Sequence, residues 1–84
     1  MHTLINLACP KANQTLRRHR NQPLILKRDA THQLARFMPP SHGWTRWDLY
    51  QVGQRIPAHW FEQPFEVYLG DTLLHQYIPN LEVT

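Results

Sequence analysis

Short hydrophobic runs alternate with turn-forming residues along the whole chain. Residues 2–8 place apolar and polar side chains in loose alternation, which predicts a first strand. Residues 23–28 form a compact apolar run that ends in two basic residues, and this predicts a second short strand. The sequence contains no internal repeat. Seven prolines are spread along it, so the elements between them are short.

The most regular helical pattern covers residues 30–37. Its apolar residues recur at helical spacing and fall on one face: Ala30, Leu34, Phe37 and Met38. Asp29 occupies the position of an N-cap, and Pro39 and Pro40 prevent the helix from continuing. We therefore predict a helix here, packed against one face of a sheet.

Three other regions are less regular. Residues 11–20 contain good helix formers, and Ala12 and Leu16 lie one turn apart, so this segment is either an exposed basic helix or a basic loop. Residues 47–52 are compatible with a helix or a strand, and their β-forming side chains favour a strand. Residues 56–61 surround a proline, which predicts an edge strand or an ordered loop.

The C-terminal region has the signature of a β-hairpin. Gly70-Asp71 suits a two-residue type II′ turn, in which Leu69 faces Thr72 and, by strict alternation, Glu66 faces His75. This register assigns five apolar side chains to the buried face: Phe65, Val67, Leu69, Leu74 and Ile78. Tyr77 falls on the opposite face. The segment is similar to the strand–turn–strand unit of small SH3-like barrels. That resemblance implies no catalytic residue in this chain.

These elements predict an α+β fold. We expect a small antiparallel sheet of three to five strands with one or two short helices and a C-terminal β-hairpin, forming a single domain over residues 1–84. The longest aliphatic run has three residues, so no membrane span is expected. The N-terminus lacks the features of a secretory signal, and the lone Cys9 has no intrachain disulfide partner, which together predict a cytoplasmic protein.

The charged residues are unevenly distributed along the chain. Eight basic residues and one acidic residue precede Asp48, whereas one basic and five acidic residues lie from Asp48 onward. The candidate binding residues in the basic half are Lys11, Arg17, Arg18, Arg20, Lys27 and Arg28. Arginine and lysine bind backbone phosphates, and the same side chains also bind carboxylates on an acidic protein. A solvated surface without a ligand is the alternative.

Aromatic residues provide a second set of candidates. The chain has three tryptophans, and four aromatic side chains are candidate contacts: Trp44, Trp47, Trp60 and Phe61. Beside arginine, such rings stack on unpaired bases or anchor a protein interface. Packing in the core is the alternative for at least two of the tryptophans.

The sequence offers little for catalysis or metal binding. No two of the six histidines lie three or four residues apart, and one cysteine cannot form a Cys-x-x-Cys pair. The carboxylates are isolated, no glycine-rich phosphate loop occurs, and no base neighbours Cys9. We therefore expect no catalytic residue, no metal and no cofactor.

The combined features favour a small non-catalytic nucleic-acid-binding or nucleoprotein-associated protein that uses its N-terminal basic patch. The alternative is a protein-binding adaptor or inhibitor of the kind that phages and mobile elements encode, attached to a larger host complex through exposed aromatic residues. A homodimer that pairs exposed strand edges is a third arrangement.

Overall fold

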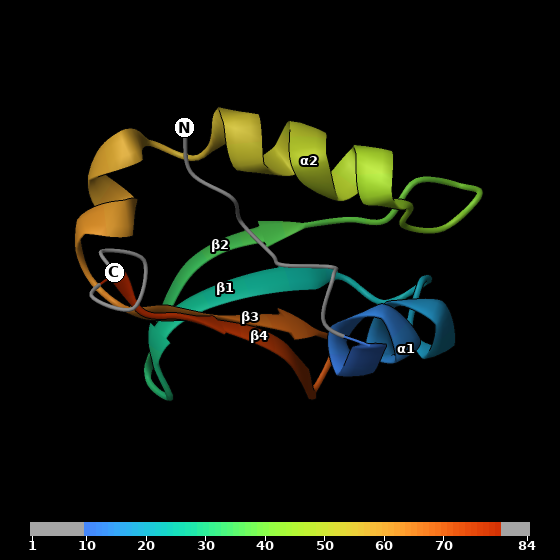
Figure 1. Ribbon diagram of the computed structural model, residues 1–84, viewed down its shortest axis with the longest axis horizontal. Coiled ribbons are helices and arrows are strands. Elements are labelled where there is room, and N and C mark those ends of the chain that lie inside the picture. Colours follow the sequence, from blue (N-terminus) through green and yellow to red (C-terminus); the bar gives the residue numbers. More distant parts are fainter. Residues whose placement is uncertain (1–9, 80–84) are drawn as a thin grey trace.

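The computed structural model describes residues 10–79, which form one four-stranded antiparallel sheet and its helices (Figure 1). The elements follow in the order α1 (Pro10–Arg18), β1 (Leu24–Asp29), β2 (His32–Phe37), α2 (Arg46–Arg55), the 3₁₀ helix η1 (Ala58–Glu62), β3 (Phe65–Leu69) and β4 (Thr72–Tyr77). The sheet order is β2-β1-β3-β4. This arrangement confirms the predicted α+β fold and its C-terminal hairpin. The strand predicted over residues 2–8 lies outside the described residues, as does Cys9.

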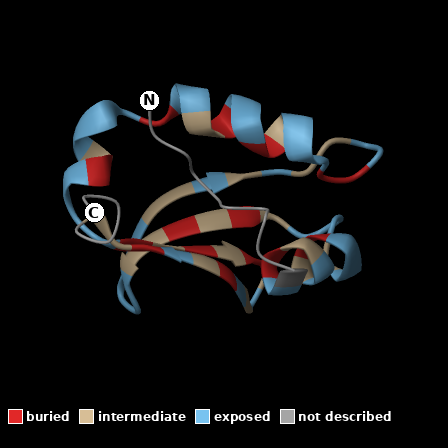
Figure 2. Ribbon diagram, viewed as in Figure 1, coloured by how far each residue is buried: buried red, intermediate tan, exposed pale blue. Residues whose placement is uncertain are grey.

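The hydrophobic core lies between one face of the sheet and the helices (Figure 2). In β1, Leu24 and Leu26 are fully buried while the intervening Ile25 is half-buried, as expected for a strand with one face in the core. Helix α2 runs above the sheet with its buried side toward the strands (Figures 1 and 2). Helix α1 resolves the choice between helix and loop, and it adds Ala12 and Leu16 to the same core.

The predicted helix over residues 30–37 is wrong, because residues 32–37 form the edge strand β2 and residues 30 and 31 form the turn before it. The Asp29 carboxylate does not cap a helix; its Oδ1 accepts from the backbone N–H groups of Thr31 at 2.8 Å and His32 at 3.0 Å and closes the turn between β1 and β2. A helix N-cap and a turn of this kind both use an Asp side chain that accepts hydrogen bonds from nearby backbone N–H groups, so Asp29 fits either one. Pairing of β2 with β1, from Leu24 opposite Phe37 to Asp29 opposite His32, selects the strand.

The strand preferred for residues 47–52 is also wrong, because they belong to helix α2. Thr45 is the N-cap of a capping box with Asp48, and this pair of reciprocal hydrogen bonds starts the helix. Leu49, Val52 and Ile56 then fall at helical spacing and are all buried. The β-forming side chains Trp47 and Tyr50 lie on the exposed side of the helix, where strand propensity has little influence.

Residues 58–62 form the helix η1, which corrects the predicted edge strand or loop. The Phe61 ring from this helix packs edge-on against Phe65 and Tyr77, with ring centroids 5.5 and 5.2 Å apart, and Phe65 stacks on Tyr77 at 5.0 Å. These three rings fill the core at the end of the sheet where β3 begins and β4 finishes.

The β3–β4 hairpin follows the predicted register only next to its turn. Leu69 faces Thr72 and Tyr68 faces Leu73 as expected, and a β-bulge then shifts the pairing by one residue. Glu66 consequently faces Gln76 instead of His75. The same shift buries Tyr77, which strict alternation assigns to the exposed face, and leaves Ile78 half-buried.

Candidate functional site

Three loops meet at the end of the sheet beside α1, and hydrogen bonds join them. Trp44 donates from its backbone N–H to the carbonyl of Arg20 at 2.9 Å and from its indole Nε1 to the carbonyl of Gln22 at 2.8 Å. The backbone N–H of Gly70 donates to the carbonyl of Pro23 at 2.9 Å. The segment that follows α1 is therefore held against both the start of α2 and the β3–β4 turn.

The first turn of α2 is fixed by its capping box. Thr45 Oγ1 accepts from the backbone N–H of Asp48 at 3.2 Å, and Asp48 Oδ2 accepts from the backbone N–H of Thr45 at 3.0 Å. The hydrogen bond from the Thr45 hydroxyl, at 2.8 Å, is the main cause that lowers the pKa of the Asp48 carboxyl group. The backbone that carries Arg46 and Trp47 is therefore fixed at the start of α2.

A groove of about 250 Å³ lies between α1 and the start of α2. We call it the arginine groove; its lining residues are Asn13, Leu16, Arg17, Arg20, Trp44, Thr45 and Arg46. Three of these side chains are guanidinium groups, and none is a carboxylate. Arginine presents a planar fork of donors that matches phosphate and carboxylate oxygens. The groove therefore concentrates positively charged donor groups of the kind that suit an anionic ligand.

Two exposed aromatic side chains follow Arg46 on α2. Trp47 and Tyr50 stack on one another on α2, with ring centroids 5.5 Å apart and an angle of 21° between the planes. The Trp47 residue is 64% exposed and Tyr50 is 49% exposed. Arg46 precedes Trp47 directly and lies one helical turn from Tyr50, so the Trp47–Tyr50 pair continues the surface that begins at the arginine groove.

The six basic residues predicted from the sequence do not form one patch. Arg17, on α1, and Arg20, in the loop that follows it, line the arginine groove, and Arg18 is exposed at the end of α1. Lys11 lines a different hollow, between α1 and β4. Lys27 Nζ lies 4.7 Å from the centre of the Tyr68 ring, and Arg28 Nη1 donates to the carbonyl of Pro64 at 2.8 Å. Both residues belong to the second half of β1, away from the groove.

The four predicted aromatic contacts also separate. Trp47 is exposed, whereas Trp44 and Phe61 are only 4% and 3% exposed and pack in the core. Trp60 is half-buried against the core, with His59 edge-on to its ring at 6.4 Å. Trp44 still reaches the arginine groove as part of its lining. Arg46 and Tyr50 are not among the binding residues predicted from the sequence, and the signal for them was the Thr45-x-x-Asp48 capping box at the start of a helix.

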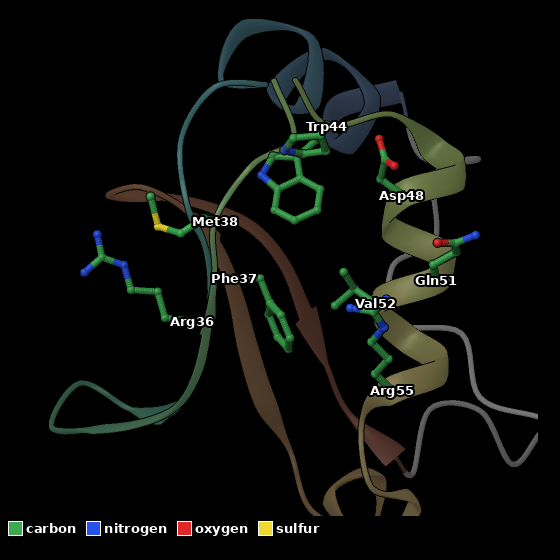
Figure 3. Close-up of a pocket in the computed structure, with 9 residues that line it drawn as sticks. Arg36, Phe37, Met38, Trp44, Asp48, Gln51, Val52 and Arg55 are labelled. Carbon is green, nitrogen blue, oxygen red and sulfur yellow. The ribbon is translucent and has the colours of Figure 1, made fainter. Parts of the chain in front are cut away.

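A second groove, of about 420 Å³, separates β2 from α2. Figure 3 shows Phe37 and Val52 pointing toward each other across it, with the Trp44 indole at one end. Two arginines, Arg36 and Arg55, line it together with a carboxylate, Asp48. Its charge is therefore mixed, and Arg36 extends to the side of β2 away from the helix (Figure 3).

The described residues show neither a metal centre nor a membrane-crossing helix. Over residues 10–79, no group of three or more histidine, cysteine or acidic side chains is arranged to hold a metal ion. No helix in the same range has the length and apolar character needed to cross a bilayer.

Comparison with known proteins gives no assignment. No family model matches the chain. No curated protein matches it. No solved structure matches it either.

Proposed function

We propose that this protein is a small non-catalytic nucleic-acid-binding or nucleoprotein-associated protein that holds backbone phosphates in the arginine groove. The observation that supports this proposal is the convergence of Arg17, Arg20 and Arg46, from two helices and a connecting loop, on one groove without a carboxylate. Guanidinium groups bind phosphate oxygens through paired, charge-assisted hydrogen bonds.

The way the groove is built favours binding. Trp44 fixes the backbone at Arg20 and Gln22, and the capping box fixes the start of α2, so the backbones that carry the arginines need little rearrangement. The chain has a net charge of +3, which attracts a polyanion over a longer range. The exposed Trp47–Tyr50 pair adds contact surface next to the charged groove.

Salt dependence of binding tests the proposal. Fluorescence anisotropy of a labelled oligonucleotide is measured with the full chain at several salt concentrations, and the slope of log K against log salt is compared between variants. Replacing Arg17 and Arg46 with alanine removes two phosphate contacts, so the slope should become shallower by roughly 1.4 to 1.8. Affinity at low salt should fall in the same variant.

A charge-matched variant provides the control. Arg36→Ala with Arg55→Ala also removes two positive charges, and both residues line the second groove instead. Equal losses in the two variants would show that net charge alone attracts the oligonucleotide and would contradict the arginine groove as its site. No binding by the unaltered protein at low salt would reject the proposed function and favour the alternative, a protein-binding adaptor or inhibitor.

A further inference from the structure

We propose that the ligand is single-stranded nucleic acid, with an unpaired base stacked on Trp47 and the neighbouring phosphate in the arginine groove. This inference rests on the proposed function and specifies its substrate class. Two features of different chemistry favour this ligand: an exposed aromatic pair on α2, and a groove of arginines whose lining includes the preceding residue, Arg46.

Trp47 presents a ring that the protein itself does not use for its core. One face of the ring stacks on Tyr50, at a centroid distance of 5.5 Å, and the residue remains 64% exposed. The buried side of α2 is supplied instead by other residues, Leu49 and Val52. Stacking on Tyr50 restricts the orientation of the indole, so a base that stacks on Trp47 meets an ordered surface at little further cost in side-chain entropy.

The two features are also adjacent in the sequence, as the binding of one nucleotide strand to both requires. Arg46 and Trp47 are consecutive residues in the capped first turn of α2. Arg46 lies on the flank of the helix that lines the groove, while Trp47 lies on its exposed side. A strand that places a phosphate near Arg46 therefore brings an adjacent base close to Trp47.

The accessibility of the base faces distinguishes a single strand from a duplex as the ligand. In a duplex each base is stacked between its neighbours, and its face is closed to a protein ring unless the base is unstacked at a cost of a few kcal/mol. In a single strand the faces are available, and aromatic side chains stack on them without regard to sequence. Between these two forms of nucleic acid, the exposed Trp47–Tyr50 pair therefore favours the single strand.

The test compares one labelled DNA oligonucleotide as a single strand and as a duplex, by anisotropy, with the full-length chain. The unaltered protein should bind the single strand more tightly than the duplex. Trp47→Ala should weaken single-strand binding roughly 5- to 100-fold and change duplex binding less than about 2-fold. Trp47→Tyr, which keeps an aromatic face, should retain most of the affinity, and thermal unfolding of each variant verifies that it is folded.

Tyr50→Ala provides a second variant in the pair, with a smaller expected loss for the single strand because Tyr50 supports Trp47 from one side. If both strand forms bind equally, with sensitivity to Arg17→Ala and Arg46→Ala but not to Trp47→Ala, the inference is overturned while the proposed function stands. Equal weakening of both forms by Trp47→Ala overturns it as well. Failure of both forms to bind at low salt overturns the inference and the proposed function together.

Discussion

The two β-hairpins within residues 10–79 close their turns by different means. Between β1 and β2, the Asp29 carboxylate accepts hydrogen bonds from the backbone of Thr31 and His32 and from the Thr31 hydroxyl at 2.8 Å. Between β3 and β4, Gly70 adopts a positive φ of 62°, which the backbone of glycine tolerates. One turn therefore depends on a charged side chain and the other on a backbone conformation.

The hairpins also differ in how much of the core they contribute. Both strands of the β3–β4 hairpin carry buried residues, including the fully buried Phe65, Val67 and Leu69. In the β1–β2 hairpin the buried residues lie on β1 alone, and the edge strand β2 has none. The β3–β4 hairpin is thus held by its packing, and the β1–β2 turn by local polar contacts at an exposed edge. This difference predicts which conditions and substitutions each hairpin withstands.

The largest effect should come from the buried hairpin. Phe65→Ala removes a ring that contacts both Phe61 and Tyr77, and it should lower the free energy of unfolding by about 3 to 5 kcal/mol, since a cavity remains. Phe37→Ala in β2 should cost clearly less because that ring is only half-buried. Urea denaturation of both variants measures the two values, and equal losses would remove the distinction between the hairpins.

A smaller effect is expected from the glycine turn. Gly70→Ala forces a side chain into the left-handed region and brings its Cβ to 2.9 Å from Gln22 Oε1, so stability should fall by about 1 to 2 kcal/mol. The same substitution at Gly53, inside α2, should instead stabilise the protein by up to about 1 kcal/mol. Thermal unfolding distinguishes the two signs; a neutral Gly70→Ala would show that the turn accommodates a side chain.

The smallest effect concerns pH and the turn closed by a side chain. Hydrogen bonds with His32 first, and then with Thr31, hold the pKa of the Asp29 carboxyl group well below its usual range. Its contribution to stability is therefore present above the unfolded-state pKa of about 4 and is lost as the pH falls below that value. Asp29→Asn should be less stable than the unaltered protein near neutral pH, and the two stabilities should converge in acid. A gap that persists unchanged in acid would mean that the charge of Asp29 does not contribute.

Local sequence signals identified some elements correctly and misassigned others. Gly70-Asp71 defined the C-terminal hairpin because the turn and the flanking alternation agree. Residues 30–37 satisfied a helical pattern equally well, but pairing with β1 outweighed it. Tertiary contacts decide such cases, since the intrinsic preferences of short segments differ by little. The bulge in β4 was not visible in the sequence, and it is what buries Tyr77.

The candidate site was partly predictable for the same reason. The run of basic residues indicated Arg17 and Arg20, and the structure places both in the arginine groove. Their partner Arg46 is 26 residues further along the chain than Arg20, and it joins them because Trp44 bonds to the carbonyls of Arg20 and Gln22. Sequence proximity instead suggested Lys27 and Arg28, which follow β1 away from that groove.

The three tryptophans differ in exposure, so their intrinsic fluorescence can report on different parts of the protein. Trp44 is buried, Trp60 is half-buried and Trp47 is largely in solvent, so their indole emissions report on three separate places. Trp44 reports unfolding of the end of the sheet beside α1, whereas Trp47 is accessible to a soluble quencher such as iodide in the folded state. Single-tryptophan variants would thus follow folding and surface accessibility independently, with no attached label.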